Sequence, residues 1–318
     1  MGELRFDGRT AIVTGAGGNP SLGRAHAMLL AARGANVVVN DIGRSEAPGY
    51  EDEASAEAIA AEIRALGGRA VASTRSVADE EGAQAIVAAA IDAFGGLDIL
   101  VNNAGVSVAA PFDQMTSADT RRHVDVNLMG TVWMCRAAWP HMAARRYGRI
   151  VNTGSGAFAG MWALAIYGAS KGGIFSLTRA LAAEGAAFGV KVNTVNPGGF
   201  TRMLHAQQYD TSPMYQHARR NLPAELVSPA VAFLAHESCP VTGECFDVMG
   251  GEVRRTYLAQ TQGFADPGLT IETVARRWDE VMGAPRDPVI GLGAVDSELW
   301  HIKPYERGGA GAKQPDDA

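Results

Sequence analysis

Two kinds of segment alternate along this chain. Short β-branched apolar runs are followed by longer Ala-rich stretches in which apolar positions recur at helical spacing. This alternation predicts an α/β fold with a doubly wound parallel sheet of seven strands, covered by helices on both faces. The strands are predicted at Thr10–Thr14, Asn36–Asn40, Ala70–Arg75, Ile99–Asn102, Arg149–Asn152, Lys191–Asn196 and Glu244–Val248. The helices are predicted at Gly23–Arg33, Ser55–Leu66, Glu80–Phe94, Ser117–Ala143 and Ala169–Ala187.

Several segments lie outside this alternation. The polar residues 43–54 predict a surface loop, and the long irregular stretch Gly199–Pro223 is typical of a functional lid. A helix-like Ile271–Met282 and a polar tail follow the last predicted strand. We therefore predict a main domain over residues 1–253, an extension over 254–305 that packs on this domain or on a neighbouring subunit, and a disordered tail over 306–318.

Composition and charge narrow the classes of function. The 318 residues are 47% hydrophobic and 19% charged, which is typical of a folded globular chain. The net charge of −6 and the pI near 5.7 provide no basic surface for nucleic acid or for anionic membranes. We expect neither partner.

The cysteines and the apolar runs indicate where the protein resides. Cys135, Cys239 and Cys245 are too few and too scattered for a disulfide framework or a zinc site, although Cys239 and Cys245 would pair if their strands approached. No apolar run reaches the roughly 20 residues that span a bilayer, and the N-terminus lacks the pattern of a secretory signal. These observations favour a reducing cytoplasm, without a bound metal.

A Gly-rich loop, Thr14-Gly15-Ala16-Gly17-Gly18-Asn19-Pro20-Ser21-Leu22-Gly23, follows the first strand and opens the first helix. Backbone N–H groups and the helix N-terminus at such a turn favour the pyrophosphate of a dinucleotide. Asp41 ends the second strand, where its carboxylate accepts hydrogen bonds from the adenosine ribose and repels a 2′-phosphate. This favours NAD over NADP, although the nearby Arg44 leaves NADP open.

Tyr167 and Lys171 lie four residues apart, which places them one turn apart on the same face of a helix. Tyrosine titrates near pH ~10, so a tyrosine that acts as a base at neutral pH needs roughly 4 kcal/mol of favourable interaction with its phenolate. A neighbouring ammonium supplies part of it. Ser155 follows a predicted strand and is placed to hold a substrate oxygen, and Asn127 lies in an apolar helix where a water leading to Lys171 is one possible partner. Alone, each of these residues is equally consistent with packing or capping.

Together these residues resemble the short-chain dehydrogenase/reductase family, whose members have a Rossmann sheet and transfer hydride between NAD(P) and a carbinol or carbonyl. The resemblance runs from about Phe6 to Glu252. It also includes Asn102-Asn103-Ala104-Gly105 and Asn196-Pro197-Gly198 followed by Thr201. By this resemblance the catalytic residues are Asn127, Ser155, Tyr167 and Lys171. The implied cofactor-binding residues are Gly15, Ser21, Leu22, Gly23, Asp41, Ser76, Val77, Asn103, Ala104, Gly105, Tyr167, Lys171, Pro197, Gly198 and Thr201.

The resemblance implies a part for each group of these residues. Asn103, Ala104 and Gly105 line the adenosine side, while Pro197, Gly198 and Thr201 hold the nicotinamide and Lys171 also contacts its ribose. The chain departs from the family pattern at two places. The Gly-rich loop is two residues longer than usual, with Ser21 in place of its middle glycine, and Ser76 stands where an aspartate often contacts the adenine, which leaves that contact weaker or made by the backbone of Val77.

Within the family, Val37–Gly43, the insertion after it and Leu22–Ala27 are similar to the dehydrogenase domain of peroxisomal multifunctional enzymes of β-oxidation. This similarity implies an NAD-dependent dehydrogenase acting on a secondary alcohol or ketone of the hydroxysteroid or 3-hydroxyacyl-CoA class. The lengthened loop is also similar to that of enoyl-thioester reductases, which reduce C=C bonds but space Tyr and Lys more widely. A non-catalytic NAD-sensing regulator is the third alternative.

Two further features bear on substrate and assembly. Large apolar residues flank the expected site and favour a bulky apolar substrate, although each fits equally a packing role. These residues are Phe158, Met161, Trp162, Met203 and Tyr215. The Ala-rich helices Ser117–Ala143 and Ala169–Ala187 present small side chains, and in the resembling family such helices form a tetramer. We therefore expect a homotetramer or a homodimer.

Overall fold

The computed structural model describes residues 2–43, 55–206, 213–283 and 285–287. Contacts divide the chain into two compact units, Met1–Leu258 and Ala259–Ala318. From position 44 onward the predicted surface loop over 43–54 lies outside the described residues, and so does the whole tail predicted over 306–318.

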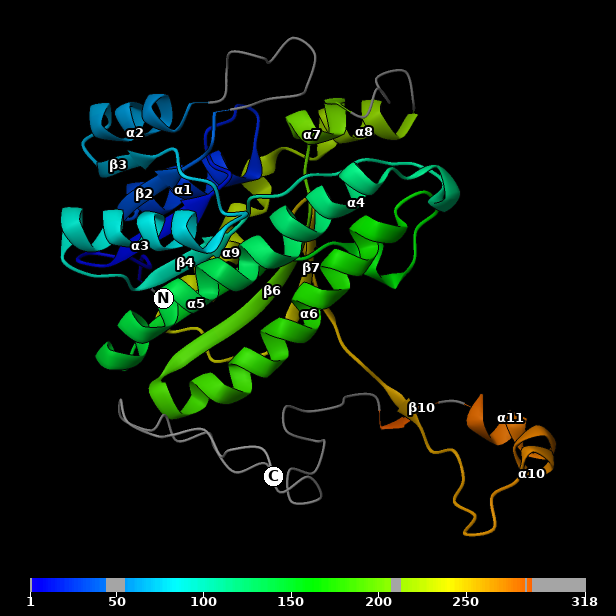
Figure 1. Ribbon diagram of the computed structural model, residues 1–318. Coiled ribbons are helices and arrows are strands. Elements are labelled where there is room, and N and C mark those ends of the chain that lie inside the picture. The colour runs from blue at the N-terminus through cyan, green and yellow to red at the C-terminus, as the bar shows by residue number, and fades with distance from the viewer. Residues whose placement is uncertain (1, 44–54, 207–212, 284, 288–318) are drawn as a thin grey trace, which may run out of the picture. The chain divides into compact units, whose positions relative to one another are not determined.

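The first unit is built on one sheet, with its described strands in the order β3-β2-β1-β4-β5-β6-β7-β8 (Figure 1). The strands from β1 to β7 pair in parallel, and their order reverses between β1 and β4. This is the Rossmann arrangement, in which the reversal opens a crevice at the carboxyl ends of the strands. The bounds are β1 (Thr10–Thr14), β2 (Asn36–Asn40), β3 (Arg69–Ser73), β4 (Ile99–Asn102), β5 (Gly148–Thr153), β6 (Val190–Gly198), β7 (Cys245–Met249) and β8 (Glu252–Thr256).

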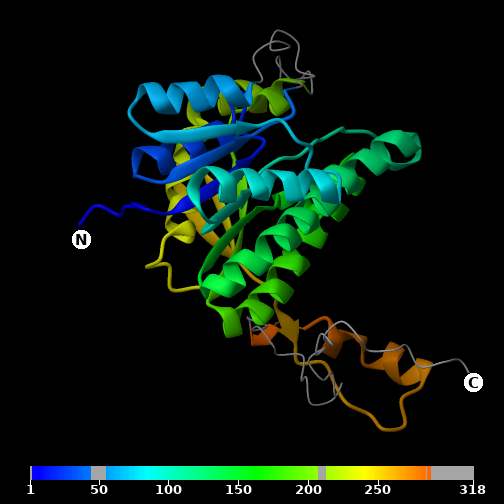
Figure 2. The same cartoon turned by 60° about the vertical axis from the view of Figure 1, so that its left-hand side comes forward.

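Helices cover both faces of this sheet. One core cluster joins the strands to α1, α2 and α9, and the other joins them to α3, α5 and α6. Figures 1 and 2 show α5 and α6 side by side along one face of the sheet. The bounds are α1 (Leu22–Ala32), α2 (Ala56–Ala65), α3 (Glu80–Phe94), α4 (Ser117–His123), α5 (Gly130–Arg145), α6 (Ala165–Gly185), α7 (Arg202–Ala206), α8 (Pro213–Asn221) and α9 (Ser228–Ala235).

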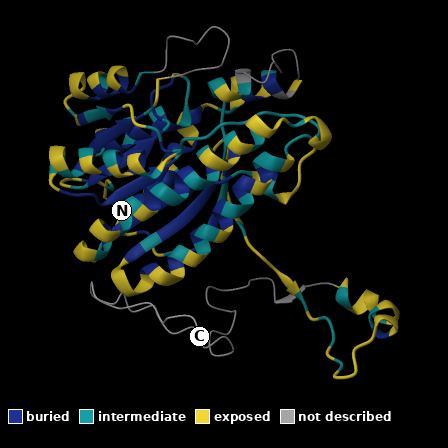
Figure 3. Cartoon of the chain, in the orientation of Figure 1, coloured by how far each residue is buried: buried dark blue, intermediate teal, exposed yellow. Residues whose placement is uncertain are grey.

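The side chains of a single strand enter both cores. In β1, Ala11 and Val13 belong to the cluster on the α1 face, whereas Ile12 belongs to the cluster on the α3 face. Successive side chains of a strand point to opposite faces, so a strand covered on both sides needs apolar residues at consecutive positions. All five residues of β1 and of β2 are buried for this reason (Figure 3).

The prediction of seven strands is wrong by one, because β8 pairs antiparallel with β7 and adds an eighth strand among the described residues. Gly250 and Gly251 connect the two strands with φ values of 58° and 85°. Two residues with positive φ make a tight hairpin turn that glycine adopts without strain. The Gly-Gly pair was therefore the signal for this strand. β8 also spans position 253, at which the main domain was predicted to end.

Three predicted segments differ in detail. The single helix predicted over Ser117–Ala143 consists of α4, a π-helical segment Val124–Met129, and α5. The stretch Gly199–Pro223, predicted to be irregular, contains α7 and α8. Its Tyr209 lies outside the described residues. The helix predicted over Ile271–Met282 is interrupted at Arg277, whose φ of −105° and ψ of 18° lie outside the helical region.

The described residues of the second unit form four short elements, which are β9 (Gln260–Thr261), α10 (Ile271–Arg276), α11 (Trp278–Val281) and β10 (Pro285–Asp287). β9 and β10 pair antiparallel. The hydroxyl of Thr261 donates to the carbonyl oxygen of Val281 at 2.8 Å, and the Arg277 guanidinium lies 4.1 Å from the centroid of the Phe264 ring. These contacts hold the unit together locally.

Candidate active site

The predicted site residues follow the carboxyl ends of neighbouring strands. Gly15 follows β1, Asp41 follows β2, Asn103 follows β4, Ser155 lies just beyond β5, and Pro197 lies at the end of β6. Because these strands are parallel and adjacent, the sheet gathers at one edge residues that are far apart in the sequence. Ligands of open α/β sheets bind at this edge.

The Gly-rich loop is packed tightly, and at Gly15 and Gly23 a side chain would collide with backbone atoms. A Cβ at Gly15 would lie 2.7 Å from the Cα of Ala104, and Gly15 has a φ of +65°. A Cβ at Gly23 would lie 2.3 Å from the carbonyl oxygen of Gly15. Both glycines therefore let the loop lie directly against β4 and the start of α1, and they leave a cradle lined by backbone.

Ser21 is the N-cap of α1, and its side chain serves the loop. Its Oγ accepts from the backbone N–H of Arg24 at 3.1 Å and donates to the carbonyl oxygen of Gly18 at 2.8 Å. The next two residues, Leu22 and Gly23, lie in the first helical turn, where backbone N–H groups have no acceptor within the helix. This loop fits the pyrophosphate of a dinucleotide through backbone N–H groups.

Asp41 closes the other side of the loop. One carboxylate oxygen accepts from the backbone N–H of Gly17 at 2.9 Å, and the other accepts from Gly43 at 3.0 Å. A carboxylate has about four acceptor positions, so these bonds leave capacity for ribose hydroxyls. Asp41 thus both shapes the loop and fits the predicted ribose contact.

The segment after β4 is bound tightly to β1. The Asn103 amide donates to the carbonyl oxygens of Thr14 and Gly15 at 2.9 and 3.0 Å, and the Thr14 hydroxyl accepts from the backbone N–H groups of Asn103 and Ala104, each at 3.0 Å. The side chain of Asn103 therefore positions the loop. Thr14 was missed as a site residue, although it directly precedes the Gly-rich loop.

Ser76 and Val77 have local partners. The Ser76 hydroxyl accepts from the backbone N–H of Ala78 at 3.0 Å, which shapes the turn before α3. Val77 is buried in the core on the α3 face, against Gly130. The contacts of both side chains are therefore structural ones, within the turn for Ser76 and within the core for Val77.

The structure brings Tyr167, Lys171 and Ser155 close together. Tyr167 and Lys171 lie one turn apart on α6, with the Lys171 Nζ 5.7 Å from the centroid of the Tyr167 ring. Lys171 is 3% exposed, and its ammonium donates to the carbonyl oxygen of Thr153 at 2.7 Å. Ser155 caps the turn Gly156–Ala159, where its Oγ accepts from the backbone N–H of Ala157 at 3.2 Å, and this turn packs against α6.

Burial opposes the charged form of both α6 groups. It raises the pKa of Tyr167, and the hydrogen bond from Ser155 lowers that pKa only in part. Burial also lowers the pKa of Lys171 to about 8. The protein by itself thus keeps the phenol protonated, and a phenolate needs further positive charge nearby. An oxidised nicotinamide ring, when bound, supplies that charge.

Asn127 lies in the π-helical segment and is fully buried. Its amide oxygen accepts from the backbone N–H of Val106 at 2.8 Å, and its amide nitrogen donates to the Val106 carbonyl oxygen at 3.0 Å and to the Ser170 hydroxyl at 3.3 Å. Protein groups thus hold the Asn127 amide in place, and its link to Lys171 through a water stays a prediction. Ser170 in turn donates to the carbonyl oxygen of Tyr167, which links Asn127 to the catalytic turn of α6.

His123 is a neighbour of Tyr167 that was not predicted. It is fully buried, and its ring packs edge-on against the Tyr167 ring with centroids 6.1 Å apart. Its Nε2 accepts from the backbone N–H of Val108 at 3.0 Å, so its Nδ1 carries the proton and donates to the carbonyl oxygen of Asp119 at 2.8 Å. In the sequence, the signal that could have drawn attention to His123 was its position four residues before Asn127, about one helical turn away.

The residues at the end of β6 include Pro197 and Gly198, and Thr201 precedes α7. A Cβ at Gly198 would lie 2.5 Å from the Cγ of Met249, so β6 lies closely against β7 there. This places the predicted nicotinamide contacts at the same sheet edge as Ser155. Whether Pro197, Gly198 and Thr201 bind the nicotinamide stays a prediction.

The apolar residues expected to contact a substrate divide into two groups. Phe158 stacks on Phe175 with centroids 5.4 Å apart, and Tyr215 is 2% exposed, so both are packed into the protein. Met161 and Trp162 are exposed by 53% and 86%, and Met203 is also exposed. The exposed group is available to a bulky apolar ligand, whereas the packed group is not.

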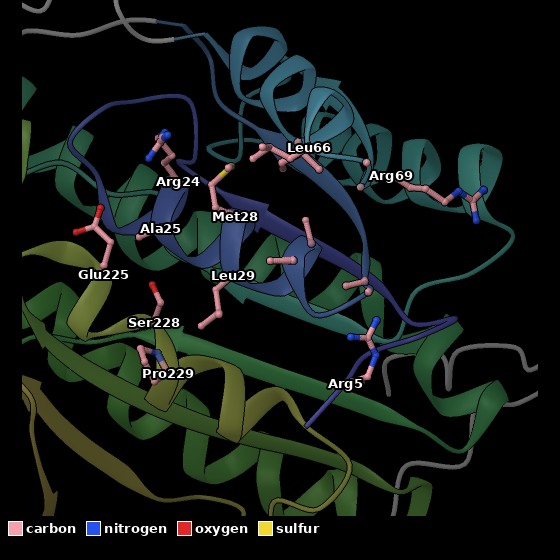
Figure 4. Close-up of a pocket in the computed structure, with 17 residues that line it drawn as sticks. Arg5, Arg24, Ala25, Met28, Leu29, Leu66, Arg69, Glu225, Ser228 and Pro229 are labelled. Carbon is pink, nitrogen blue, oxygen red and sulfur yellow. The ribbon is translucent and has the colours of Figure 1, made fainter. Parts of the chain in front are cut away.

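A pocket among the described residues lies elsewhere, between α1, α2 and the start of α9 (Figure 4). It is lined by Met28, Leu29 and Ser228, and by residues such as Ala35 and Arg69, which lie at the amino ends of β2 and β3. The predicted site residues instead follow the carboxyl ends of the strands. None of the predicted site residues lines this pocket.

Disulfide and metal chemistry have no site among the described residues. Cys135, Cys239 and Cys245 are all buried and free, so the conceivable Cys239–Cys245 pair is not formed. No group of three or more His, Cys, Asp or Glu side chains there is arranged to hold a metal ion. Nor does the described part of the chain contain a helix with the length and apolarity to traverse a membrane.

Comparison with known proteins agrees with this geometry. The profile of the family described as short chain dehydrogenase matches residues 9–212, a range that begins just before β1 and contains all four predicted catalytic residues. The chain belongs to the short-chain dehydrogenase family. The predicted family and the Rossmann fold are both confirmed.

Several short-chain dehydrogenases are similar over most of the chain. The putative short-chain type dehydrogenase/reductase Rv0148 of Mycobacterium tuberculosis is 38% identical over 86% of this chain and 93% of its own length. The peroxisomal multifunctional enzyme type 2 of Mus musculus is 37% identical over 87% of this chain and 37% of its own length. The chain thus spans about a third of that larger enzyme, and a similar share of the peroxisomal hydratase-dehydrogenase-epimerase of Saccharomyces cerevisiae.

Solved structures of the family agree with the fold. A short chain dehydrogenase from Mycobacterium avium superposes with a TM-score of 0.74 at 34% identity, covering 90% of this chain and 99% of that one. The full-length peroxisomal multifunctional enzyme type 2 from Drosophila melanogaster superposes with a TM-score of 0.73 at 30% identity, covering 94% of this chain and 50% of that one.

Proposed function

We propose that this oxidoreductase is an NAD-dependent dehydrogenase that interconverts a secondary alcohol and a ketone on a bulky apolar substrate of the hydroxysteroid or 3-hydroxyacyl-CoA class. The observation that carries this proposal is that the buried Lys171 lies one helical turn from Tyr167 on α6, with Nζ 5.7 Å from the ring centroid, while Ser155 caps the turn that packs against α6. This arrangement provides a proton acceptor, a group that holds the substrate oxygen, and a cation that stabilises the acceptor's anion.

In the direction of oxidation, Tyr167 takes the hydroxyl proton of the alcohol at its phenolic oxygen. Ser155 holds the same substrate oxygen as its C–O bond becomes a carbonyl. Lys171 favours the phenolate by charge, and the Thr153 carbonyl oxygen fixes the position of its ammonium. A bound oxidised nicotinamide supplies the acceptor for the hydride that leaves the carbinol carbon.

The residues that would hold the cofactor fit NAD. The backbone around Gly15, Leu22 and Gly23 suits the pyrophosphate, and Asp41 suits the adenosine ribose. A 2′-phosphate beside the Asp41 carboxylate would be repelled, which supports NAD over NADP. In this proposal Pro197, Gly198 and Thr201 lie on the nicotinamide side.

Relatives support the proposed substrate class. The 3beta-hydroxysteroid dehydrogenase 1 of Eggerthella lenta is 36% identical over 77% of this chain and 93% of its own length. The peroxisomal relatives belong to multifunctional enzymes. Reduction of a C=C bond is the alternative that the lengthened loop around Ser21 favours, and the one-turn spacing of Tyr167 and Lys171 counts against it.

The test is the absorbance of NADH formed by the purified chain with NAD and a panel of hydroxysteroids, 3-hydroxyacyl-CoA thioesters and alicyclic alcohols. We expect turnover with at least one of the first two classes, and a Tyr167→Phe variant should lose about 10² to 10⁴-fold in kcat while it still binds NAD. Turnover of enoyl thioesters alone would favour the C=C reductase. Tight NAD binding without turnover across the panel would favour a redox-sensing regulator.

We further propose a cytoplasmic homotetramer, with a homodimer as the alternative. The small side chains of α5 and α6 support close packing between subunits, as the Ala-rich sequence of both helices indicates.

A further inference from the structure

An arginine from a distant part of the sequence approaches the Gly-rich loop. Arg202, the first residue of α7, donates its backbone N–H to the carbonyl oxygen of Pro20 at 3.2 Å. Its guanidinium lies over Gly18, because a Cβ built there would be 1.8 Å from Nη2 and 2.2 Å from Cζ. Gly18 therefore leaves room for this guanidinium, and the arginine side chain forms part of the wall of the loop.

Two nitrogens of the guanidinium lack partners among the residues that the structure describes. Its Nε and Nη1 atoms are buried and form no hydrogen bond there. Arginine stays protonated in proteins, so this is a cation with two buried donors that are not satisfied. Burying such a group is costly unless an anion or an acceptor completes it. By contrast, the guanidinium of Arg24, on the same side of the sheet edge, is paired with Glu62.

The groups around Arg202 indicate what kind of anion would pair with its guanidinium. The loop that it contacts ends at the N-terminus of α1, where backbone N–H groups also favour negative charge. The Asp41 carboxylate also contacts the loop, but at Gly17, whose backbone N–H donates to it at 2.9 Å. A planar guanidinium beside backbone N–H groups matches the paired oxygens of a diphosphate.

We propose that Arg202 binds the pyrophosphate of the dinucleotide and is the main side-chain cation for it at this loop. This assignment rests on the proposed function, since it presumes that a dinucleotide is the cofactor. Coenzyme A also carries a diphosphate, and the same chemistry would serve it if it bound there. We assign the site to the dinucleotide because the guanidinium contacts the loop after β1, next to the carboxylate that suits a ribose.

The test measures binding by isothermal titration calorimetry with NAD, ADP-ribose, adenosine and coenzyme A. In an Arg202→Gln variant we expect the affinity for NAD and for ADP-ribose to fall about tenfold to a hundredfold, the range for a charge-assisted hydrogen bond, while adenosine binds as before. Arg220→Gln, which removes the same charge from an exposed position of α8, should leave all four affinities unchanged.

Unchanged affinity of Arg202→Gln for ADP-ribose overturns the proposal, and so does a loss confined to coenzyme A. A wild-type chain that binds neither NAD, NADP nor ADP-ribose refutes the proposed function itself, which distinguishes the two failures. Far-ultraviolet circular dichroism of each variant verifies that it is folded.

A double-mutant cycle with Gly18 provides a second, independent readout. Gly18→Ala should displace the guanidinium and weaken ADP-ribose binding, because the added methyl occupies its position. In an Arg202→Ala background the same substitution has room and should change the affinity little. Equal losses in the two backgrounds would show that Gly18 and Arg202 act separately, and would contradict the proposed contact.

Discussion

Lys171 is expected to favour catalysis while it destabilises the folded protein. Its ammonium is buried, and its pKa falls from the ordinary lysine value of 10.5 to about 8 because burial disfavours the charge. A lowered folded-state pKa means that the unfolded chain binds the proton more tightly. At 1.36 kcal/mol per unit, this amounts to about 3 kcal/mol of destabilisation at pH 7.

A Lys171→Met variant tests this reasoning because methionine is of similar length and carries no charge. Removing the buried cation should stabilise the fold by about 3 kcal/mol at pH 7, and losing the hydrogen bond to the Thr153 carbonyl oxygen should offset about 1 kcal/mol of that gain. We expect urea unfolding at pH 7 to give a net stabilisation of about 2 kcal/mol.

The same variant should lose activity. At 5.7 Å and an effective dielectric constant of about 20, a unit charge at the Lys171 Nζ stabilises charge on the Tyr167 ring by about 3 kcal/mol. The variant should therefore show the rise of kcat/KM with pH shifted about two units upward, and about a hundredfold lower activity at pH 7.

The pH dependence of stability has a defined sign. Between pH 8 and pH 10.5 the unfolded lysine is protonated while the folded one is largely neutral, so the wild-type chain should gain stability relative to Lys171→Met as the pH rises through this window. Lys191→Met is the matched control, since the Lys191 ammonium also donates to a backbone carbonyl but lies at the amino end of β6. It should keep activity. A Lys171→Met protein that is less stable than wild type at pH 7, with unchanged activity, would refute the reasoning.

Three further predictions concern the loop, the cofactor and the assembly. Gly23→Ala forces a Cβ to within 2.3 Å of the Gly15 carbonyl oxygen, so it should lower stability by about 1–3 kcal/mol and weaken NAD binding, as measured by thermal unfolding and calorimetry. Asp41→Asn keeps an acceptor for Gly17 but removes the charge, so the ratio of kcat/KM for NADP to that for NAD should rise. Preserved discrimination would argue against charge repulsion. Sedimentation velocity should give the mass of a tetramer or a dimer, and a monomer at micromolar concentration would contradict the proposed assembly.

Much of the site could be predicted because it depends on order along the chain. In a parallel sheet each strand delivers the residue that follows it to the same edge, so a Gly-rich loop after β1, an aspartate after β2 and a serine after β5 converge without knowledge of distances. Tyr167 and Lys171 were predicted together because a helix places residues four apart on one face. The eighth strand was missed although Gly250 and Gly251 marked its turn.

By itself, then, the sequence determined the alternation of strands and helices, the end of the sheet at which the predicted site residues gather, and the one-turn spacing of Tyr167 and Lys171 on a helix. Periodicity and spacing are local properties of a chain. Only the tertiary structure decided which polar groups are already satisfied. It showed that Asn127 is bonded to Val106, that His123 packs against Tyr167, and that Arg202 reaches Gly18 with two unsatisfied donors. Hydrogen-bond partners and burial depend on segments that meet only after folding, so they cannot be predicted from the spacing of residues along the sequence.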